Sequence, residues 1–337
     1  MPLQLSVVVA TYNRQELLLA LLEDLRRQDL PSDAFEVVLV DDGSREPVRP
    51  RVSELALPYT LTLIEQQNSG QSIARDNGIR EASADIIVIV DDDMRLPSHF
   101  LRAHLAAHAA GNTLVFGWIR SPPTIDELPL FERFHARQID AFVEGVRRGE
   151  RVRGAGLCTG NVSLRRADYV AIGGFDRTLT RSEDRDLGIR LEAHGARIAF
   201  AEQAYSTHGS DHNDLERWLR RARMYGRCDS TIADKHDLLE YVDPWNFLFA
   251  VNPVSRPLLL LATAAPRAGE RLARTAMTLS ELLDRAGVSS LAISGTTLVY
   301  GLEYFIGMRE HAGSLRESVR NLRRYLSKRA AAHPVEA

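Results

Sequence analysis

Three consecutive carboxylates, Asp91, Asp92 and Asp93, are the residues of this chain best suited to chemistry. They directly follow the apolar, mostly β-branched run IIVIV at residues 86–90. Adjacent carboxylates repel one another, and a hard divalent cation with oxygen ligands relieves that repulsion. A solvated acidic turn after a strand is the simpler alternative. We favour the cation site, for Mn²⁺ or Mg²⁺.

Continuous apolar runs of this kind are typical of strands buried on both faces of a parallel sheet. Similar strand patterns lie at residues 5–10, 35–40, 59–64 and 114–119. Helical patterns lie between them at residues 14–27, 68–82 and 98–110. This alternation predicts an α/β fold with a mostly parallel, Rossmann-like sheet flanked by helices.

The carboxyl ends of neighbouring parallel strands meet at one edge of a sheet, where such folds bind ligands. Tyr12 follows the first predicted strand, and Asp41 with Asp42 follows the second. The Tyr12 ring could stack on a nucleobase or pack against the protein, and the carboxylates could accept hydrogen bonds from a base or a ribose. Together with a cation, these groups predict a site for a nucleoside diphosphate.

A dinucleotide-binding domain would instead carry the pattern G-x-G-x-x-G directly after its first strand. Residues 10–15 read ATYNRQ and contain no glycine. The sequence therefore argues against NAD or FAD binding.

After Pro122 and Pro123 the regular alternation of strand and helix patterns ends. Helices are predicted at residues 130–148, 166–172, 183–194 and 213–225, and strands at 157–164 and 198–201. From about residue 237 the pattern is mostly helical, with no second strand-rich domain. We expect a catalytic domain over residues 1–230, with halves at 1–120 and 121–230, and a helical extension over 231–337.

The length, net charge and cysteine content of the chain argue against some classes of function. The chain has 337 residues and a net charge of −3, which argues against a nucleic-acid partner. Two cysteines, Cys158 and Cys228, do not make a disulfide framework, and a reducing cytoplasm fits. Cys158 is expected to pack in the core. The N-terminus lacks the pattern of a signal peptide, and no clean run of about 18–20 apolar residues is present.

Seven stretches of the chain, in this order, resemble glycosyltransferase family 2, which has the GT-A fold: SVVVATYNR, VVLVDDGS, NSGQSIARDNGI, IVIVDDDM, GNVSLRR, GGFD and SEDRDLGIRL. The resemblance covers about residues 3–226. It implies an inverting, metal-dependent transfer of a sugar from a nucleotide sugar to an acceptor hydroxyl. A UDP-sugar is the favoured donor, with GDP- and dTDP-sugars as alternatives.

The resemblance also implies roles for residues around the nucleotide. Ala10 and Tyr12 would line the base pocket, and Asp42, with Asp41 beside it, would bind a uracil N–H. Gly70 and Arg75 lie in the segment that folds over the nucleotide.

Further roles concern the cation and the donor sugar. Asp91 and Asp93 would be the ends of a DXD motif around Asp92, with one end on the ribose and the other on the cation. His208 is the candidate for a further metal contact, with His212 behind it. Gly160 and Asn161 would lie beside the donor sugar, or form a tight turn into a strand.

The SED stretch matches the part of the family that supplies a catalytic base, with Asp184 as the base and Glu183 beside it. Attack by a hydroxyl on an anomeric carbon needs a proton acceptor within hydrogen-bond reach, and displacement from the opposite face inverts that carbon. Carboxylates at a helix N-terminus are also stabilised by the helix dipole, so the same residues could simply cap the helix.

The basic helix near residue 220 could contact the diphosphate or present a solvated face; its arginines are Arg217, Arg220, Arg221, Arg223 and Arg227. It lacks the glutamine of the element that processive family members carry, so we expect non-processive transfer. The C-terminal helices are expected to pack on the catalytic domain or form a homodimer. Because the last helix is basic, peripheral contact with an anionic membrane is an alternative, and an acidic partner or plain solvation would fit equally well.

Two other functions stay open from the sequence. A nucleotidyltransferase would join a sugar phosphate to a nucleoside triphosphate and release pyrophosphate. A catalytically silent module would bind a nucleotide sugar without transfer.

Overall fold

The computed structural model describes residues 3–209, 214–236 and 240–332, and the chain divides into two compact units. The first contains residues 1–125 and 138–211, and the second contains residues 126–137 and 212–337. Each unit is described by itself.

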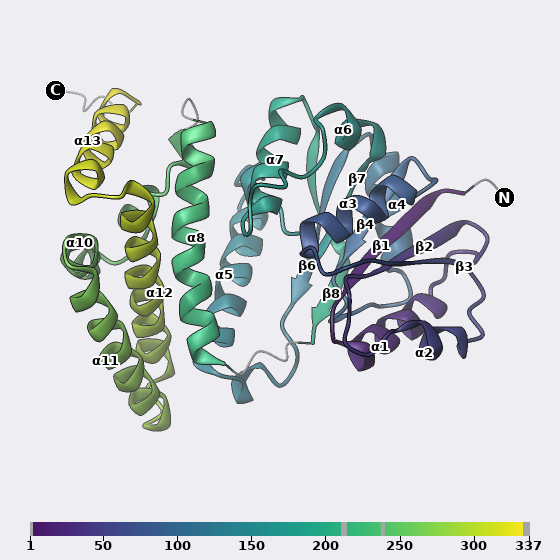
Figure 1. Cartoon of the computed structure of the whole chain (residues 1–337), viewed down its shortest axis with the longest axis horizontal. Helices are drawn as coiled ribbons and strands as arrows, with labels where there is room; N and C mark the ends of the chain where they lie inside the picture. The colour runs from purple at the N-terminus through teal and green to yellow at the C-terminus, as the bar shows by residue number, and fades with distance from the viewer. Residues whose placement is uncertain (1–2, 210–213, 237–239, 333–337) are drawn as a thin grey trace. The chain divides into compact units, whose positions relative to one another are not determined.

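The first unit is built on an eight-stranded sheet in the order β3-β2-β1-β4-β7-β6-β8-β5 (Figure 1). Its strands are β1 (Leu5–Thr11), β2 (Phe35–Asp41), β3 (Thr60–Glu65), β4 (Ile86–Val90), β5 (Met94–Arg95), β6 (Leu114–Arg120), β7 (Asn161–Arg165) and β8 (Ile198–His208). Strands β1 to β4 are parallel to one another, and β6 is parallel to β8. Strands β7 and β5 run antiparallel to their neighbours.

Alternating residues of the central strands fill two apolar cores, one on each face of the sheet. On β1, Val7 and Val9 pack with α1 (Gln15–Arg26) and α4 (Phe100–Ala109). Val8, between them, packs on the other face with α3 (Gln71–Glu81) and α7 (Glu183–Ala193). Short helices α2 (Arg49–Ser53) and α6 (Arg166–Ala171) complete the unit. The predicted α/β architecture is confirmed.

Two strand predictions differ from the structure. The segment predicted as a strand at 157–164 begins as a loop after a 3₁₀ turn at Gly154–Gly156, and only β7 is extended. The strand predicted at 198–201 continues to His208, because β5 pairs with its far end and Met94 lies opposite His208. His208 therefore ends a strand rather than lying in a loop.

The second unit is helical, as expected for the C-terminal region. It contains α8 (Leu215–Lys235), α9 (Asn246–Ala250), α10 (Arg256–Ala264), α11 (Pro266–Arg285), α12 (Ser289–Ala312) and α13 (Leu315–Ala332). Residues 130–137 of α5 (Leu130–Arg147) pack into the same core as α8. The domain division expected at residue 230 stays a prediction; by packing, α8 belongs with the C-terminal helices.

Helix α12 is the core helix of the second unit. In the described part of the chain it is the one helix long and apolar enough to cross a membrane, with a mean hydropathy of 1.2, and 61% of that window is buried. It approaches α8 closely at Gly307, where a Cβ would lie 1.9 Å from the Arg223 carbonyl oxygen. Burial within the unit accounts for its apolar sequence.

Candidate active site

The turn after β4 directs its three carboxylates to different partners. Asp91 Oδ1 accepts a hydrogen bond from Arg75 Nη2 at 2.5 Å. Asp92 accepts from the Thr11 hydroxyl at 2.7 Å and from Arg14 Nη1 at 3.3 Å. Asp93 Oδ2 accepts from the same Arg14 nitrogen at 2.7 Å. The guanidinium groups of Arg14 and Arg75 therefore supply positive charge, whereas the sequence had led us to expect a cation alone.

Asp93 retains the features of a cation ligand. Its Oδ1 is buried and has no hydrogen-bond partner among the described residues. His208 Nε2 lies 3.4 Å from its Oδ2. Burial raises the pKa of the Asp93 carboxyl, but His208 and Arg14 outweigh it, so the pKa is lowered and the group is ionised.

No group of three or more His, Cys, Asp or Glu side chains in the described segments is arranged to hold a metal ion. Asp93 and His208 nevertheless fit a divalent cation that takes its remaining ligands from a bound diphosphate and water, as Mg²⁺ sites commonly do. The orphaned Asp93 oxygen is the observation that supports this fit.

Arg75 joins the turn after β4 to the start of α7. Its side chain is buried, with the residue 3% exposed, and Nη1 lies 3.5 Å from Glu183 Oε1. Gln71 Nε2 donates to the same oxygen at 2.7 Å. Burial disfavours the Arg75 charge, but Asp91 and Glu183 raise its pKa above the ordinary value. The N-terminal parts of α3 and α7 are thereby held at the acidic turn.

Asp184, in the first turn of α7, has a strongly perturbed pKa. Burial raises the pKa of its carboxyl to about 7, and the charge of Glu183 adds to the effect. Asp91 raises it further and Arg75 lowers it, so these groups lie within electrostatic range of Asp184. One Asp184 oxygen accepts the amide of Arg185 at 2.8 Å, a contact that a helix cap would also make. A carboxylate with this pKa is suited to take up a proton near neutral pH.

The carboxylates after β2 shape the adjoining loops. Asp42 is buried and accepts hydrogen bonds from the Gln66 side chain and the Ser69 amide on Oδ1, and from the Gly70 amide on Oδ2. Asp41 accepts the amides of Ser44 and Val48. A carboxylate has about four acceptor positions, so Asp42 Oδ2 retains one for a ligand.

Tyr12 and Ala10 lie at the carboxyl end of β1. The Tyr12 side chain is 44% exposed, which makes it available for stacking rather than part of a core. Ala10 is half-buried. Gly70, at the start of α3, has a φ of +94°, a conformation that favours glycine and lets its amide reach Asp42.

Gly160 and Asn161 lie beside the acidic turn but play different parts. The Asp91 amide donates to the Gly160 carbonyl at 3.4 Å, and a Cβ on Gly160 would lie 3.2 Å from Asp91 Oδ2. The Asn161 side chain is buried in the sheet, where it donates to Ala204 O at 2.9 Å and its Oδ1 lies 3.0 Å from His104 Nε2. Asn161 therefore braces β7 with its side chain.

Two corrections concern the other predicted groups, and a third group stays untested. Cys158 is exposed rather than packed in the core. Arg223 pairs with Glu303 and Glu270 inside the second unit, so its charge is compensated there and its side chain is not a solvated face. His212 lies outside the described residues.

Sequence reasoning missed Thr11, Arg14 and Gln71. Thr11 and Arg14 flank Tyr12 at the end of β1, the same strand end already singled out for its aromatic ring. A search for donors at each strand end, as well as for carboxylates, would have found them. Gln71 follows Gly70 at the start of α3 and shows no comparable signal.

Comparison with known proteins finds a family match over part of the chain. Residues 6–166 match the family model described as "Glycosyl transferase family 2". The chain is 31% identical over 228 residues to validoxylamine A glucosyltransferase of Streptomyces hygroscopicus subsp. limoneus, a match covering 60% of this chain and 50% of that protein. The chain thus spans about half the length of this relative.

Two solved structures share the fold. The mannosyltransferase PcManGT of Pyrobaculum calidifontis, solved with GDP-Man and Mn²⁺, has a TM-score of 0.61 at 20% identity, covering 88% of this chain and 85% of that one. Residues 1–349 of S. aureus TarS, solved with UDP-GlcNAc, have a TM-score of 0.53 at 16% identity, covering 94% and 92%. Residues 6–166 therefore match glycosyltransferase family 2, and the first unit has a fold of the GT-A type.

Proposed function

We propose that the chain is an inverting, divalent-metal-dependent glycosyltransferase that moves a sugar from a nucleotide sugar to an acceptor hydroxyl, without processive synthesis. The observation that carries the proposal is the convergence of Asp91 and Asp184, linked through Arg75 and Glu183, with Asp93 in the same turn as Asp91. These groups come from the ends of β4 and the start of α7.

The net negative charge of the site favours binding of a divalent cation. Five carboxylates face two guanidinium groups, which leaves three negative charges when every acid is ionised; the acids are Asp91, Asp92, Asp93, Glu183 and Asp184. Burial raises the pKa of Asp92 to about 6, and the charges of Asp91 and Asp93 contribute. A divalent cation held by Asp93 and His208 would neutralise a departing diphosphate.

Asp184 is the proposed general base. The acceptor oxygen forms a bond to the anomeric carbon while its proton passes to the Asp184 carboxylate, and the bond from that carbon to the diphosphate oxygen breaks with the electron pair. Approach from the face opposite the leaving group inverts the anomeric configuration. Glu183 keeps Arg75 and Gln71 in place beside this carboxylate.

The nucleotide would lie along the ends of β1 and β2. Exposed Tyr12 would stack on the base, Ala10 would line its pocket, and the free acceptor position of Asp42 would take a base N–H. Gly70 and the loop before α3 would border the nucleotide, and Gly160 would leave room for the donor sugar. We favour a UDP-sugar. The complexes of TarS with UDP-GlcNAc and of PcManGT with GDP-Man and Mn²⁺ support nucleotide-sugar donors in this fold.

The test is a donor screen with UDP-, GDP- and dTDP-sugars, each with and without Mn²⁺, in which release of the nucleoside diphosphate is followed by chromatography. We expect cation-dependent release from one donor class, and a product of inverted anomeric configuration once an acceptor is found. Pyrophosphate release from UTP and a sugar phosphate would instead establish a nucleotidyltransferase. Binding without release across a broad acceptor panel would establish a silent module.

A further inference from the structure

Helix α13 presents an unpaired apolar stripe on its outer side. Leu315, Val319, Leu322 and Leu326 recur at the spacing that places residues on one face of a helix, and Leu322 is partly buried there against the core of the second unit. Of these, Leu315 is 42% exposed, Val319 is 38% exposed and Leu326 is 41% exposed. The helix therefore keeps apolar side chains in water although it is packed in the second unit.

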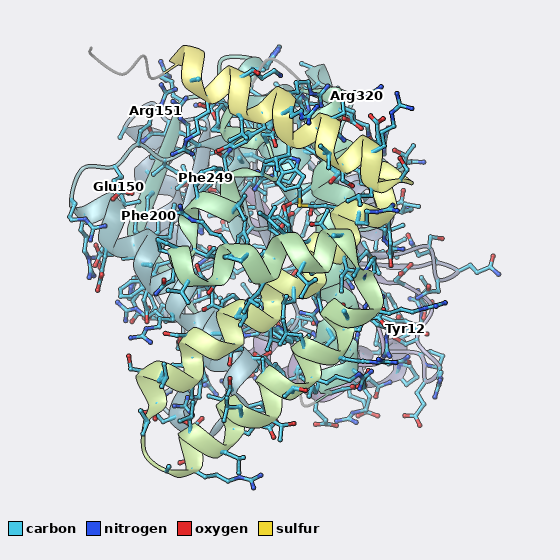
Figure 2. The ribbon with its side chains drawn as sticks, turned by 90° about the vertical axis from the view of Figure 1, so that its left-hand side faces the viewer. Tyr12, Glu150, Arg151, Phe200, Phe249 and Arg320 are labelled. Carbon is cyan, nitrogen blue, oxygen red and sulfur yellow. The ribbon has the colours of Figure 1, made fainter. Side chains whose placement is uncertain are left out.

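A band of arginines runs beside this stripe. Arg316, Arg320 and Arg323 each lie one position after a stripe residue and are exposed. Glu317 is the only acidic residue of α13, and it pairs with Arg320 at 2.5 Å. Arg316 and Arg323 have no ion pair among the described residues. Figure 2 shows α13 in yellow across the top of the view, with Arg320 labelled.

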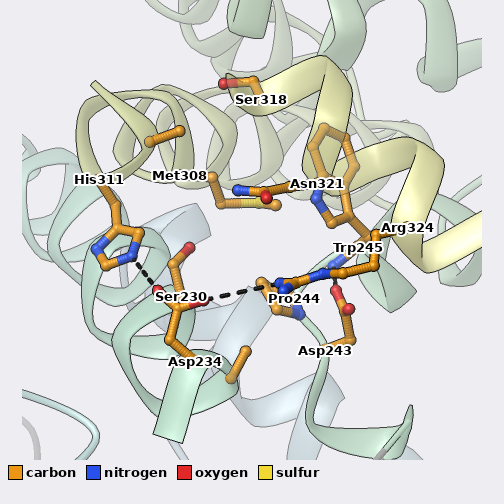
Figure 3. Close-up of a pocket in the computed structure, with 12 residues that line it drawn as sticks. Ser230, Asp234, Asp243, Pro244, Trp245, Met308, His311, Ser318, Asn321 and Arg324 are labelled. Carbon is orange, nitrogen blue, oxygen red and sulfur yellow. Dashed lines mark hydrogen bonds and ion pairs between the residues drawn. The ribbon is translucent and has the colours of Figure 1, made fainter. Parts of the chain in front are cut away.

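The adjoining side of α13 is fixed to its own unit. The Tyr325 hydroxyl donates to Asn246 Oδ1 at 2.8 Å, and the Arg329 guanidinium lies 4.3 Å from the centre of the Phe249 ring. Asn321 and Arg324 line a pocket whose other walls come from α8, α12 and residues 243–245 (Figure 3). Because this side is occupied, the leucine stripe and the arginine band are held outward in a fixed orientation.

We infer that the outer face of α13 docks on an anionic lipid surface. A helix with an apolar stripe beside basic residues lies in the interface plane, with its apolar side chains below the headgroups and its cations beside lipid phosphates. Charge complementarity favours this occupant over a second copy of the chain. A two-fold interface would pair the same patch on both subunits and bring the two arginine bands close together.

The test is flotation of the full-length protein with vesicles of phosphatidylcholine alone or with about one third phosphatidylglycerol. We expect binding to the anionic vesicles only, weakened by salt through charge screening. Arg316→Gln with Arg323→Gln should weaken binding by about 25-fold, because each arginine near such a surface is worth about 1 kcal/mol, or about fivefold. Arg26→Gln with Arg27→Gln, on the first unit, removes the same charge and should leave binding unchanged.

A second pair of variants tests the apolar stripe. Val319→Asp with Leu326→Asp should abolish binding, whereas Leu279→Asp, at an exposed leucine of α11, should not. All of these positions are exposed, so circular dichroism should show unchanged helix content. The inference is overturned if wild-type protein ignores anionic vesicles, if either α13 pair binds like wild type, or if the α13 variants convert a dimer to a monomer in light scattering without changing vesicle binding.

Discussion

Asp184 gives the sharpest test of the proposed chemistry, because its pKa of about 7 stands far from the ordinary value of 3.8. A base must be ionised to accept a proton, so kcat/KM should fall as pH drops below this value. At pH 6 the rate should be about one tenth of its plateau, and at pH 5 about one hundredth. An aspartate with an ordinary pKa would retain more than about 90% at pH 5.

A variant of Glu183 tests what raises the pKa of Asp184. Its charge is the second cause, after burial, of the raised Asp184 pKa. Glu183→Gln removes that charge, so the acid limb of the pH profile should move to lower pH. The profile is measured with saturating cation and donor on wild-type and variant protein. An acid limb that stays in place would show that Glu183 and Asp184 are not electrostatically coupled.

Asp184→Asn should separate activity from stability. A general base contributes roughly 10²–10⁴ to the rate, so kcat should fall by about that factor. Because the folded state holds the Asp184 proton more tightly than the unfolded state does, wild-type stability is lost as pH rises from about 4 through about 7. Asparagine does not ionise, so the unfolding free energy of the variant should exceed that of wild type by about 1–2 kcal/mol at pH 8. This figure is smaller than the full pKa shift would give, because Asp184 is only half-buried and solvent screens its charge.

Urea denaturation at pH 5 and pH 8 measures this difference, and Asp140→Asn, at an exposed residue of α5, is the matched control. Near-normal turnover by Asp184→Asn, or a pH profile that is flat between pH 5 and pH 8, would refute the assignment of Asp184 as the base.

Three further predictions concern other parts of the structure. Arg75→Met leaves buried carboxylates without their shared guanidinium and should cost about 3 kcal/mol in urea unfolding; a loss below about 1 kcal/mol would contradict the buried ion-pair network. Gly307→Ala places a Cβ 1.9 Å from the Arg223 carbonyl and should cost about 2 kcal/mol, whereas Gly156→Ala, whose Cβ would meet its nearest neighbour at 3.8 Å, should be neutral by thermal denaturation. Desolvation of the Cys158 thiol and the charges of Asp184 and Asp91 raise its pKa, so it should react slowly with iodoacetamide although the residue is exposed. UDP with Mn²⁺ should slow the reaction further, and equal rates with and without the ligand would place the thiol outside the site.

The gathering of the acidic strand ends was predictable from the sequence. Parallel β1, β2 and β4 are short, mostly apolar and followed at once by polar residues, so their ends could be placed before any side chain was seen. The partners of those acids were not predictable. Arg75 lies in the middle of a helix, and the sequence does not show that its side chain turns inward to reach both Asp91 and Glu183.

Contacts between segments distant in the sequence explain the elements that were predicted wrongly. Strand β8 extends to His208 because β6 pairs with it as far as Thr207 beyond a bulge and the two-residue strand β5 covers its end, and so short a strand leaves no periodic signal. The division into units was hidden for a related reason. Helix α8 directly follows the part of the chain that forms the first unit, yet it packs on α12 in the second. The contact is made at glycines against which the neighbouring backbone lies, and the sequence does not show which glycines have such a neighbour.

The central claim is that acidic side chains at neighbouring strand ends bind a nucleoside diphosphate together with a divalent cation. The most direct measurement is calorimetric titration of UDP, GDP and dTDP into the protein with and without Mn²⁺, for wild type and Asp93→Ala. We expect one nucleotide to bind at least about tenfold more tightly with Mn²⁺, and this gain to disappear in the variant. Binding that is independent of Mn²⁺, or an equal gain in Asp93→Ala, would contradict the claim.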